Sequence, residues 1–418
     1  MPPSARSLER RALTATIVGT TASVMPAFLT GAVAVQLDAD IGLGDRALGF
    51  VVGGFFASAA LGSALLGRLA ERLGGVRAMQ CGLTVSAVIG VLVVSVARSP
   101  LTLGALLLVG GSANALTQPA ANLLLVERLP AARMGIAFAL KQAGMPTATL
   151  VGGALVPLVA VTYGWRWTFA IATAIALAAF ATLIGLSAAP PIQAAGAPAT
   201  APTPRRRPDL PLRLLAGYGA VGLLAAATAG ALTAFLVTAA EGAGVAEGPA
   251  GLLLTAGSAV GIVSRLVHGR LADGPRLLPI RRVALLLLIG AAAFAVLMAH
   301  RPATYLLALV PVFGAGWAWP GLFNLSVVRN NPSAPAAATG MSQTGIYIGA
   351  ASGPVLGGLI AERFGYSTLW ATCAVTATIA GGGALLLRVF LARHRARTPA
   401  SDTEPRTTAA SVERAGRP

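Results

Sequence analysis

Long apolar segments with almost no charge dominate this sequence and restrict what it can fold into. The first such segment, residues 12–36, contains no charged residue, and only 11% of the residues of the whole chain are charged. A soluble domain needs about 25% charged residues to cover its surface. A helix of about 20 apolar residues crosses the hydrocarbon of a bilayer and satisfies its own backbone hydrogen bonds there. The sequence therefore predicts an all-α integral membrane protein whose first partner is the lipid bilayer.

Twelve segments are long and apolar enough to be predicted as transmembrane helices. Their approximate limits are 12–36, 46–67, 77–97, 101–126, 134–161, 166–187, 212–239, 248–268, 282–299, 303–328, 336–361 and 367–391. The first segment follows Arg6, Arg10 and Arg11 and is too long for the apolar region of a signal peptide. It is therefore predicted to be an uncleaved first span.

The positions of the basic residues predict the orientation of these spans. With the N-terminus inside, all of the 31 Lys and Arg residues lie at or beside the cytoplasmic side except Arg46, Arg98, Arg166, Arg301 and Arg363. This is the positive-inside pattern of membrane proteins. It predicts a multi-pass protein of the cytoplasmic membrane with both termini in the cytoplasm. It also accounts for the net charge of +17 without a nucleic-acid partner.

An internal repeat indicates two halves of common design. The letters GRLA begin at Gly67 and again at Gly269, each time followed by an acid, and NLLLVERLP from Asn122 matches NLSVVRNNP from Asn324 at the same offset of 202 residues. At an offset of 205, four glycines match four others: Gly135, Gly144, Gly152 and Gly153 match Gly340, Gly349, Gly357 and Gly358. Parallel six-helix repeats form one transporter architecture. We therefore expect twelve transmembrane helices in two pseudo-symmetric six-helix bundles.

The predicted domains follow this repeat. They are an N-terminal bundle (1–187), a cytoplasmic linker (188–211), a C-terminal bundle (212–391) and a disordered cytoplasmic tail (392–418). The linker is rich in Pro and Ala and ends in the cluster Arg205–Arg207, which is typical of a flexible connection. The tail is rich in Arg, Thr, Ser and Pro, a composition that favours disorder near anionic lipid.

The loop between the second and third spans carries a recognisable motif. It contains, in order, Gly67, Glu71, Arg72, Gly74 and Arg77. This order resembles the signature loop of the major facilitator superfamily, in which Gly is followed after three residues by Asp, a basic residue, any residue and a second Gly. Glu stands here in place of the usual Asp. The resemblance extends over nearly the whole chain and implies transport by alternating access.

The same resemblance implies that this loop takes part in a cytoplasmic gate. Gly67 would let a neighbouring helix approach closely. Glu71 would pair with Arg72 or Arg77, or lie at a helix N-terminus, while the gate is closed. The alternative is that the arginines of this loop only set the topology.

The C-terminal half carries a second, weaker copy of the loop. It keeps Gly269, Arg270 and Asp273, but Gly274 and Pro275 follow where the first copy has a basic residue and its neighbour. Arg265 lies one helical turn before this copy. We assign it to the gate or to topology in preference to a ligand-binding role.

A second motif occupies the eleventh predicted span. The run GMSQTGIYIGAASGPVLGG, residues 340–358, is similar to the motif of drug/proton antiporters in the superfamily. In those proteins the motif lies on the fifth span, which here has only part of it: Gly144, Pro146, Gly152, Gly153 and Pro157. Glycines four apart favour close helix contacts. The residues assigned to helix packing are Gly349, Gly353, Pro354, Gly357 and Gly358.

Polar side chains inside predicted spans are candidates for a substrate site. An amide stripe on the fourth span consists of Asn114, Gln118 and Asn122, four residues apart. On the tenth span Trp317 and Asn324 share a face, and on the eleventh Gln343 and Tyr347 are four residues apart. The resemblance implies that these spans line a central cavity. The alternative is that the amides only join helices to one another.

Lys141 is the most distinctive candidate, because it is the only lysine of the chain. It lies on the fifth span eight residues after Arg133, which is about 12 Å along a helix. A cation at this depth could bind an anionic group of a substrate, with Gln142 beside it. The alternative is that its long side chain reaches back to the lipid headgroups.

Other chemistry is not indicated by the sequence. Neither an acidic residue nor a histidine lies in the middle of a predicted span, and Cys81 and Cys373 are isolated in different halves. An enzyme, a metal site and a cofactor are therefore not expected. Asp38 or Glu241, near helix ends, are the candidates for coupling transport to protons; the alternative is that transport is not coupled to protons.

The function expected from the sequence is secondary active transport of a small organic molecule, such as an organic anion. The protein is expected to be a monomeric permease. The alternative is a proton-coupled multidrug or metabolite efflux antiporter, since the eleventh span favours efflux and Lys141 favours an anion. A non-transporting membrane sensor on the same scaffold is the third hypothesis.

Overall fold

A computed structural model describes residues 5–130, 133–186, 208–271 and 279–397. These residues form helices and contain no β-strand. The helices of the first half are α1 (Ala5–Ala32), α2 (Ala34–Ile41), α3 (Asp45–Leu73), α4 (Gly75–Val96), α5 (Pro100–Arg128), α6 (Met134–Gln142), α7 (Gly144–Leu155), α8 (Val161–Tyr163) and α9 (Trp165–Ile184). Those of the second half are α10 (Leu212–Gly242), α11 (Glu247–Leu271), α12 (Pro279–Leu297), α13 (Pro302–Pro311), α14 (Pro320–Arg329) and α15 (Pro335–Arg397).

Among the described residues, eleven helical segments are long and apolar enough to cross a membrane. The last of them covers 59 residues, Ala338–Ala396, and is interrupted at Gly365, which has a left-handed φ of 78°. Only glycine adopts this conformation easily, so the chain turns there and α15 contributes two crossings. The prediction of an all-α membrane protein with twelve spans is confirmed.

The limits of the spans differ from those predicted at both ends of the chain. Helix α1 begins at Ala5 and ends at Ala32, followed by the short helix α2, instead of running over 12–36. Helix α15 continues to Arg397, beyond the predicted end at residue 391. Polar and basic residues extend both helices past their apolar parts, so hydropathy alone places the ends incorrectly. The linker residues 187–207 and the tail residues 398–418 lie outside the described residues.

Two spans are not continuous α-helices. In the fifth span α6 and α7 are separated at Ala143, and a π-helical turn, Val156–Ala160, precedes α8. In the tenth span a π-helical turn, Val312–Gly316, and three non-helical residues separate α13 from α14. Prolines lie at these breaks, since Pro157 falls in the first turn and Pro311 precedes the second. A proline removes a backbone N–H donor and so loosens the helical ladder.

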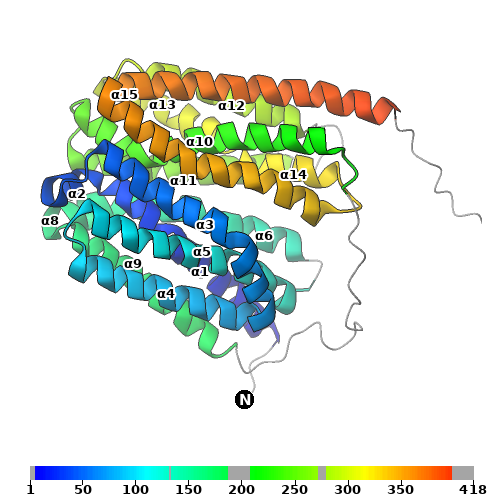
Figure 1. Cartoon of the computed structure of the whole chain (residues 1–418), viewed down its shortest axis with the longest axis horizontal. Coiled ribbons are helices and arrows are strands. Elements are labelled where there is room, and N and C mark those ends of the chain that lie inside the picture. The colour runs from blue at the N-terminus through cyan, green and yellow to red at the C-terminus, as the bar shows by residue number, and fades with distance from the viewer. Residues whose placement is uncertain (1–4, 131–132, 187–207, 272–278, 398–418) are drawn as a thin grey trace, which may run out of the picture.

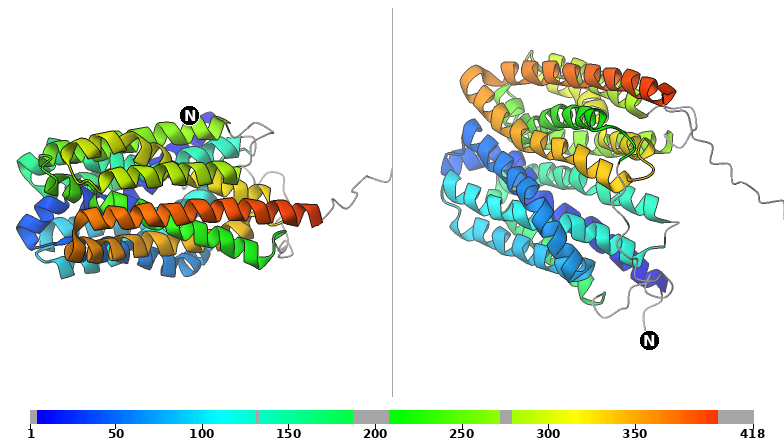
Figure 2. Two further views of the ribbon diagram at one scale, coloured as in Figure 1. Left: turned by 90° about the horizontal axis from the view of Figure 1, so that it is seen from above. Right: turned by 45° about the vertical axis from the view of Figure 1, so that its right-hand side comes forward.

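The helices run side by side as one elongated bundle (Figure 1). The first turns of α1 and the last turns of α15 lie near the same end of the bundle, which we call the terminal end; α2 and α8 lie at the opposite end. Helices α1–α9 form one half and α10–α15 the other, and the two halves diverge toward the terminal end (Figure 2). Helices α3 and α15, α7 and α11, and α1 and α10 make contacts between the halves.

Candidate functional site

The two halves meet at the opposite end of the bundle through backbone contacts that only small residues permit. A Cβ atom on Gly49 of α3 would overlap the carbonyl oxygen of Pro354 in α15. A Cβ atom on Gly153 of α7 would lie 2.6 Å from the carbonyl oxygen of Gly251 in α11. Such distances leave no room for a side chain or for water. The opposite end is therefore closed.

Hydrogen bonds reinforce this closure. The hydroxyls of Thr149 and Ser258 are 2.7 Å apart and buried between α7 and α11. Tyr366 donates a hydrogen bond of 2.7 Å to the Oδ1 atom of Asp45 at the start of α3. Because each bond has one partner in either half, separating the halves at this end would break both.

The signature loop lies at the terminal end and makes no comparable contact. No heavy atom of the described residues lies within 4 Å of a Cβ placed on Gly67 or on Gly269. Glu71, Arg72 and Arg77 are exposed and form no ion pair within the described part of the chain. Asp273 lies outside the described residues. The gate contacts expected of this loop are thus not made in this conformation, and the gating role of these residues stays a prediction.

A different acid caps the helix after the loop. Glu127, at the end of α5, accepts a hydrogen bond of 3.1 Å from the backbone N–H of Gly75, the first residue of α4. A carboxylate is favourable there because the helix N-terminus is the positive end of the helix dipole. Gly74, with φ of 80°, makes the turn, and Gly75 packs directly on the backbone of Leu124. Glu127 lies within the repeated segment that begins at Asn122, but the second copy has Arg329 at the matching position, so the repeat does not mark this carboxylate.

The amides of the stripe on α5 differ in their hydrogen bonds. The Asn114 Oδ1 atom accepts hydrogen bonds from Ser23 of α1 (3.0 Å) and from Gln118 (3.2 Å). Asn114 thus joins two helices of the same half. The Asn122 Oδ1 atom is buried and has no hydrogen-bond partner among the described residues. This oxygen remains able to accept a hydrogen bond from another molecule.

Lys141 lies at the break in the fifth span, two residues before Ala143. Its side chain is only 6% exposed and makes no hydrogen bond or ion pair with the described residues. Helix α6, which carries it, contacts α1 and α5, and Gly144 on the next turn lies close to Thr20 and Thr21 of α1. Gln142, predicted to be its companion, is exposed. A buried ammonium without a partner can bind an anion.

The break in the tenth span brings two side chains of α11 against it. Ser264 donates a hydrogen bond of 2.5 Å to the carbonyl oxygen of Gly314, and Arg265 donates one of 2.7 Å from Nη2 to that of Trp317. The guanidinium of Arg265 also lies over the ring of Trp317, 4.8 Å from its centroid. These donors satisfy carbonyl groups that the broken helix leaves free. The structure thus brings Arg265 and Trp317 together, which the sequence did not predict.

The remaining polar candidates lie on α14 and α15. The Oδ1 atom of Asn324 and the Oε1 atom of Gln343 are buried without a hydrogen-bond partner among the described residues. Tyr347 is partly buried. Buried polar atoms without partners are costly unless water or a ligand reaches them. Both amides therefore remain candidates for contact with a polar solute.

The glycines assigned to helix packing lie where α15 meets other helices. A Cβ on Gly349 or Gly353 would overlap the backbone of α10, at Leu223 and Ala227. On Gly357 it would meet the ring of Phe235, also on α10, whereas on Gly358 it would overlap the backbone of Asp45 in the other half. The run therefore joins α15 both to its own half and across the interface.

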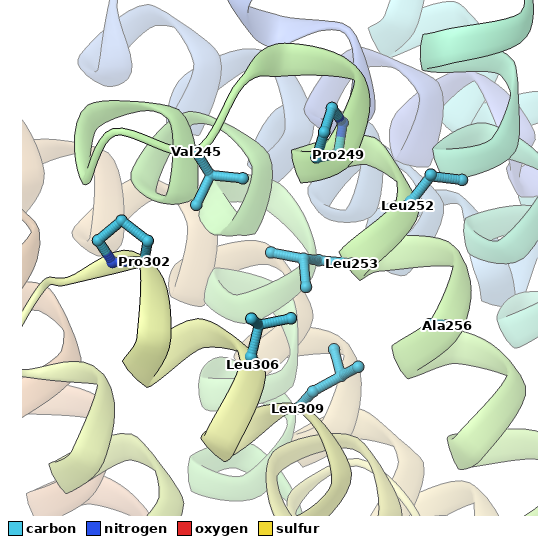
Figure 3. A pocket seen from close by; sticks show the side chains of 8 residues that line it. All are labelled: Val245, Pro249, Leu252, Leu253, Ala256, Pro302, Leu306 and Leu309. Carbon is cyan, nitrogen blue, oxygen red and sulfur yellow. The ribbon is translucent and has the colours of Figure 1, made fainter.

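A pocket of about 450 Å³ lies between the start of α11 and α13 (Figure 3). Side chains from both helices line it, including Leu252, Leu253 and Leu306. The side chains shown there are all aliphatic, and Leu252 and Leu306 are exposed on the outer surface. Such a lining offers no polar group to a solute and suits hydrocarbon instead. This pocket is not the candidate transport site.

Comparison with known proteins agrees with the architecture. The family described as Major Facilitator Superfamily matches residues 13–327 and 218–416. No curated protein matches the chain. Solved structures of membrane transporters are among those that it resembles, and the three described below share 14–17% sequence identity with it.

Three of these structures illustrate the likeness. A nucleoside transporter, NupG, has a TM-score of 0.70 at 14% identity over 91% of this chain and 99% of that one. A D-xylose-proton symporter has a TM-score of 0.70 at 14% identity over 90% and 96%. A bacterial homologue of the human lysosomal transporter Spinster, in an inward-facing and occupied conformation, has a TM-score of 0.69 at 17% identity over 93% and 96%. At these identities the likeness concerns the fold alone.

Proposed function

This chain belongs to the major facilitator superfamily, and we propose that it is a secondary transporter that moves a small organic anion across the cytoplasmic membrane. Membership in this family makes it a multi-pass membrane transporter, not an enzyme. The class of substrate and the direction of transport are the proposal.

Alternating access accounts for the asymmetry of the bundle. Two kinds of contact join the halves at the opposite end. Gly49 packs on the backbone of Pro354 and Gly153 on that of Gly251. Tyr366 donates a hydrogen bond to Asp45. At the terminal end, no described residue lies within 4 Å of a Cβ placed on Gly67 or Gly269 of the two loop copies. The positive-inside pattern of the sequence supports a cytoplasmic terminal end, and this orientation is part of the proposal. The conformation is then open to the inside, and the two copies of the loop would meet when the halves rock to the other state.

The burial of Lys141 is the observation that supports an anionic substrate. An unpaired cation inside a span costs about 2.5–3.5 kcal/mol on insertion scales, so such residues usually mark a substrate path. A lysine that reached the headgroups along the lipid-facing surface would be exposed, whereas Lys141 is 6% exposed. A substrate carboxylate would supply the missing charge. Asn122, with its buried and unpartnered oxygen, provides polar contact on the same half.

Ligand-induced thermal stabilisation of the protein in nanodiscs tests this proposal. The panel contains small carboxylates, lipophilic cations and neutral antibiotics, applied to the native protein and to Lys141→Met. Selective stabilisation by carboxylates, absent in Lys141→Met, is the expected result. The matched control is Arg133→Gln, which removes an exposed positive charge near the start of the same span. Stabilisation by cations or neutral compounds alone, equal in all variants, would show that Lys141 binds no substrate.

A proton-coupled efflux antiporter is the second candidate. The observation in its favour is the bond between Tyr366 and Asp45, which places a carboxylate across the interface of the halves. Protonation of that carboxylate would weaken the closure and so link proton binding to rocking. Export of a lipophilic cation from proteoliposomes, driven by an imposed pH gradient and lost in Asp45→Asn, is the result that would favour it.

A further inference from the structure

Arg265 is a second cation inside the membrane, in the half that does not contain Lys141. It lies on α11, six residues before the end of that helix at Leu271, and is partly buried. The ion pairs of the described residues are Arg133 with Glu9 and Arg166 with Asp40, so no carboxylate pairs with Arg265 in that part of the chain. Like Lys141, it is a charge in a span that has no counter-charge within the described part of the chain.

The contacts of the Arg265 guanidinium fix its position but leave some of its N–H donors without an acceptor in the part of the chain that the structure describes. Of its five N–H donors, one is used on the carbonyl oxygen of Trp317. The Nε atom is buried and has no hydrogen-bond partner among the described residues. Stacking on the Trp317 ring fixes the plane of the group. An arginine fixed in this way, with donors to spare, is prepared for the forked geometry of a carboxylate.

The break in the tenth span leaves open space four residues after Trp317. Gly321 is exposed, and no described heavy atom lies within 4 Å of a Cβ placed on it. Asn324 follows one turn later, with its buried Oδ1 atom unpartnered. Helix α14 begins at Pro320, so the positive end of its dipole is directed to the same break. Broken helices of this kind surround substrate sites in transporters.

A purely structural role explains less of this arrangement. If Arg265 only satisfied the broken helix, a neutral donor would suffice, as Ser264 shows one residue earlier with its hydrogen bond to Gly314. A charge is not needed for that purpose and is costly in a span. The charge of Arg265 therefore requires a separate reason.

We propose that Arg265, held by Trp317 at the break four residues before the exposed Gly321, forms an anion-binding site in the C-terminal half that takes a carboxylate group of the transported molecule. This inference rests on the proposed transport of an anion and adds a second contact, from the half opposite to Lys141. A substrate held by one cation from each half would draw the halves together. It also reassigns Arg265 from the gate to the substrate path.

Cysteine labelling tests the local charge without any knowledge of the substrate. Gly321→Cys is introduced into a protein in which Cys81 and Cys373 are replaced by Ser and Ala, and the position is open enough to accept a side chain. Its rates of reaction with the anionic sulfonatoethyl and the cationic trimethylammonioethyl methanethiosulfonates are compared. We expect the ratio of anionic to cationic rate to fall roughly tenfold when Arg265→Gln is added. Gly67→Cys, equally open but in the other half, is the control and should keep its ratio.

Thermal stabilisation by benzoate against its neutral isostere benzamide then separates the two proposals. Stabilisation by benzoate alone, lost in both Lys141→Met and Arg265→Gln and partly kept in Arg265→Lys, supports the two-cation site. Loss in Lys141→Met only would leave the proposed anion transport standing and overturn the role of Arg265. Absence of stabilisation by benzoate in the native protein would count against both. If the labelling ratio of Gly321→Cys did not change when Arg265→Gln was added, or if Gly321→Cys were not labelled, the proposed site would be overturned whatever the benzoate result.

Discussion

Tyr366 donates a hydrogen bond to Asp45 across 321 positions of sequence, and this bond joins the first half of the molecule to the second. His300 lies against the Tyr366 ring, with centroids 5.6 Å apart. Burial lowers the pKa of His300 below its ordinary value of 6.5, which favours the neutral imidazole. The closure at the opposite end thus consists of a bond between a phenol and a carboxyl group, with an imidazole packed on the phenol ring.

Removing the hydroxyl in Tyr366→Phe should shift the protein toward the state that is open at the opposite end. A hydrogen bond to a charged group contributes about 1.5–3 kcal/mol, so the population ratio of closed to open should fall roughly ten- to a hundredfold. Spin labels at the exposed positions Leu101 and Leu306, one in each half, report the change as a longer distance by double electron–electron resonance. Tyr163→Phe, at an exposed tyrosine of the same end, should leave the distance distribution unchanged. An unchanged distribution in Tyr366→Phe would show that the bond does not hold the closure.

The number of spans was predictable, but the breaks within them were not. Apolar runs interrupted by arginines define twelve crossings because hydropathy reports length and burial in lipid directly. The break at Val312–Gly316 depends on how Pro311 is accommodated and on donors from Ser264 and Arg265 of another helix. Hydropathy contains no information about such donors. For the same reason the contact between Arg265 and Trp317 could not be predicted from the sequence.

Hydrogen-bonded pairs of residues that lie far apart in the chain could not be predicted from the sequence either. The spacing of Asn114 and Gln118 predicts that they share a helix face. Only the packing of α1 on α5 shows that Ser23 donates a hydrogen bond to Asn114. Asp45 lies at the start of α3 and not in the middle of a span, and nothing in the sequence marks Tyr366 as its partner. Spacing places side chains on one face of a helix but does not say which helix that face meets.

Gly349→Ala should destabilise the C-terminal half, whereas Gly340→Ala on the same helix should not. A methyl group on Gly349 would overlap the carbonyl oxygen of Leu223 in α10, and a forced shift of packed backbone costs typically about 1–3 kcal/mol. Gly340 is exposed with nothing described within 4 Å, so alanine there is neutral or stabilising by up to about 1 kcal/mol. Thermal unfolding of both variants in the same detergent measures the difference. Equal midpoints would mean that α10 and α15 are not in contact at Gly349.

Asp40 should contribute a pH-dependent increment to stability. Its carboxylate accepts hydrogen bonds from Trp165 Nε1 (3.0 Å) and Arg166 Nη1 (2.7 Å), and these bonds lower its pKa below the ordinary 3.8. A carboxyl with a lowered pKa in the folded state stabilises above the unfolded pKa and loses this effect as the pH falls through the folded pKa. The Asp40 side chain is 45% exposed, so we expect less than about 1 kcal/mol.

The measurement for Asp40 compares the melting temperatures of the native protein and Asp40→Asn between pH 3 and pH 8. The difference should be constant above about pH 5 and should shrink below about pH 4. Asp38→Asn is the control, since Asp38 lies on the same short helix without these two partners. A difference between native protein and Asp40→Asn that persisted unchanged at pH 3 would assign the effect to something other than the charge.

Ser264→Ala should lower the stability of the broken tenth span without changing the charge preference of the proposed site. Ser264 donates to the carbonyl oxygen of Gly314 within the π-helical turn, and losing such a bond costs about 1 kcal/mol, so the melting temperature should fall by a few degrees. Because the serine is neutral, the labelling ratio of Gly321→Cys and the preference for benzoate over benzamide should stay as in the native protein. Arg265→Gln should show the converse, a modest change in stability with a large change in both charge-dependent measurements. If Ser264→Ala altered the charge preference as much as Arg265→Gln does, the shape of the break, not the guanidinium, would determine what the site binds.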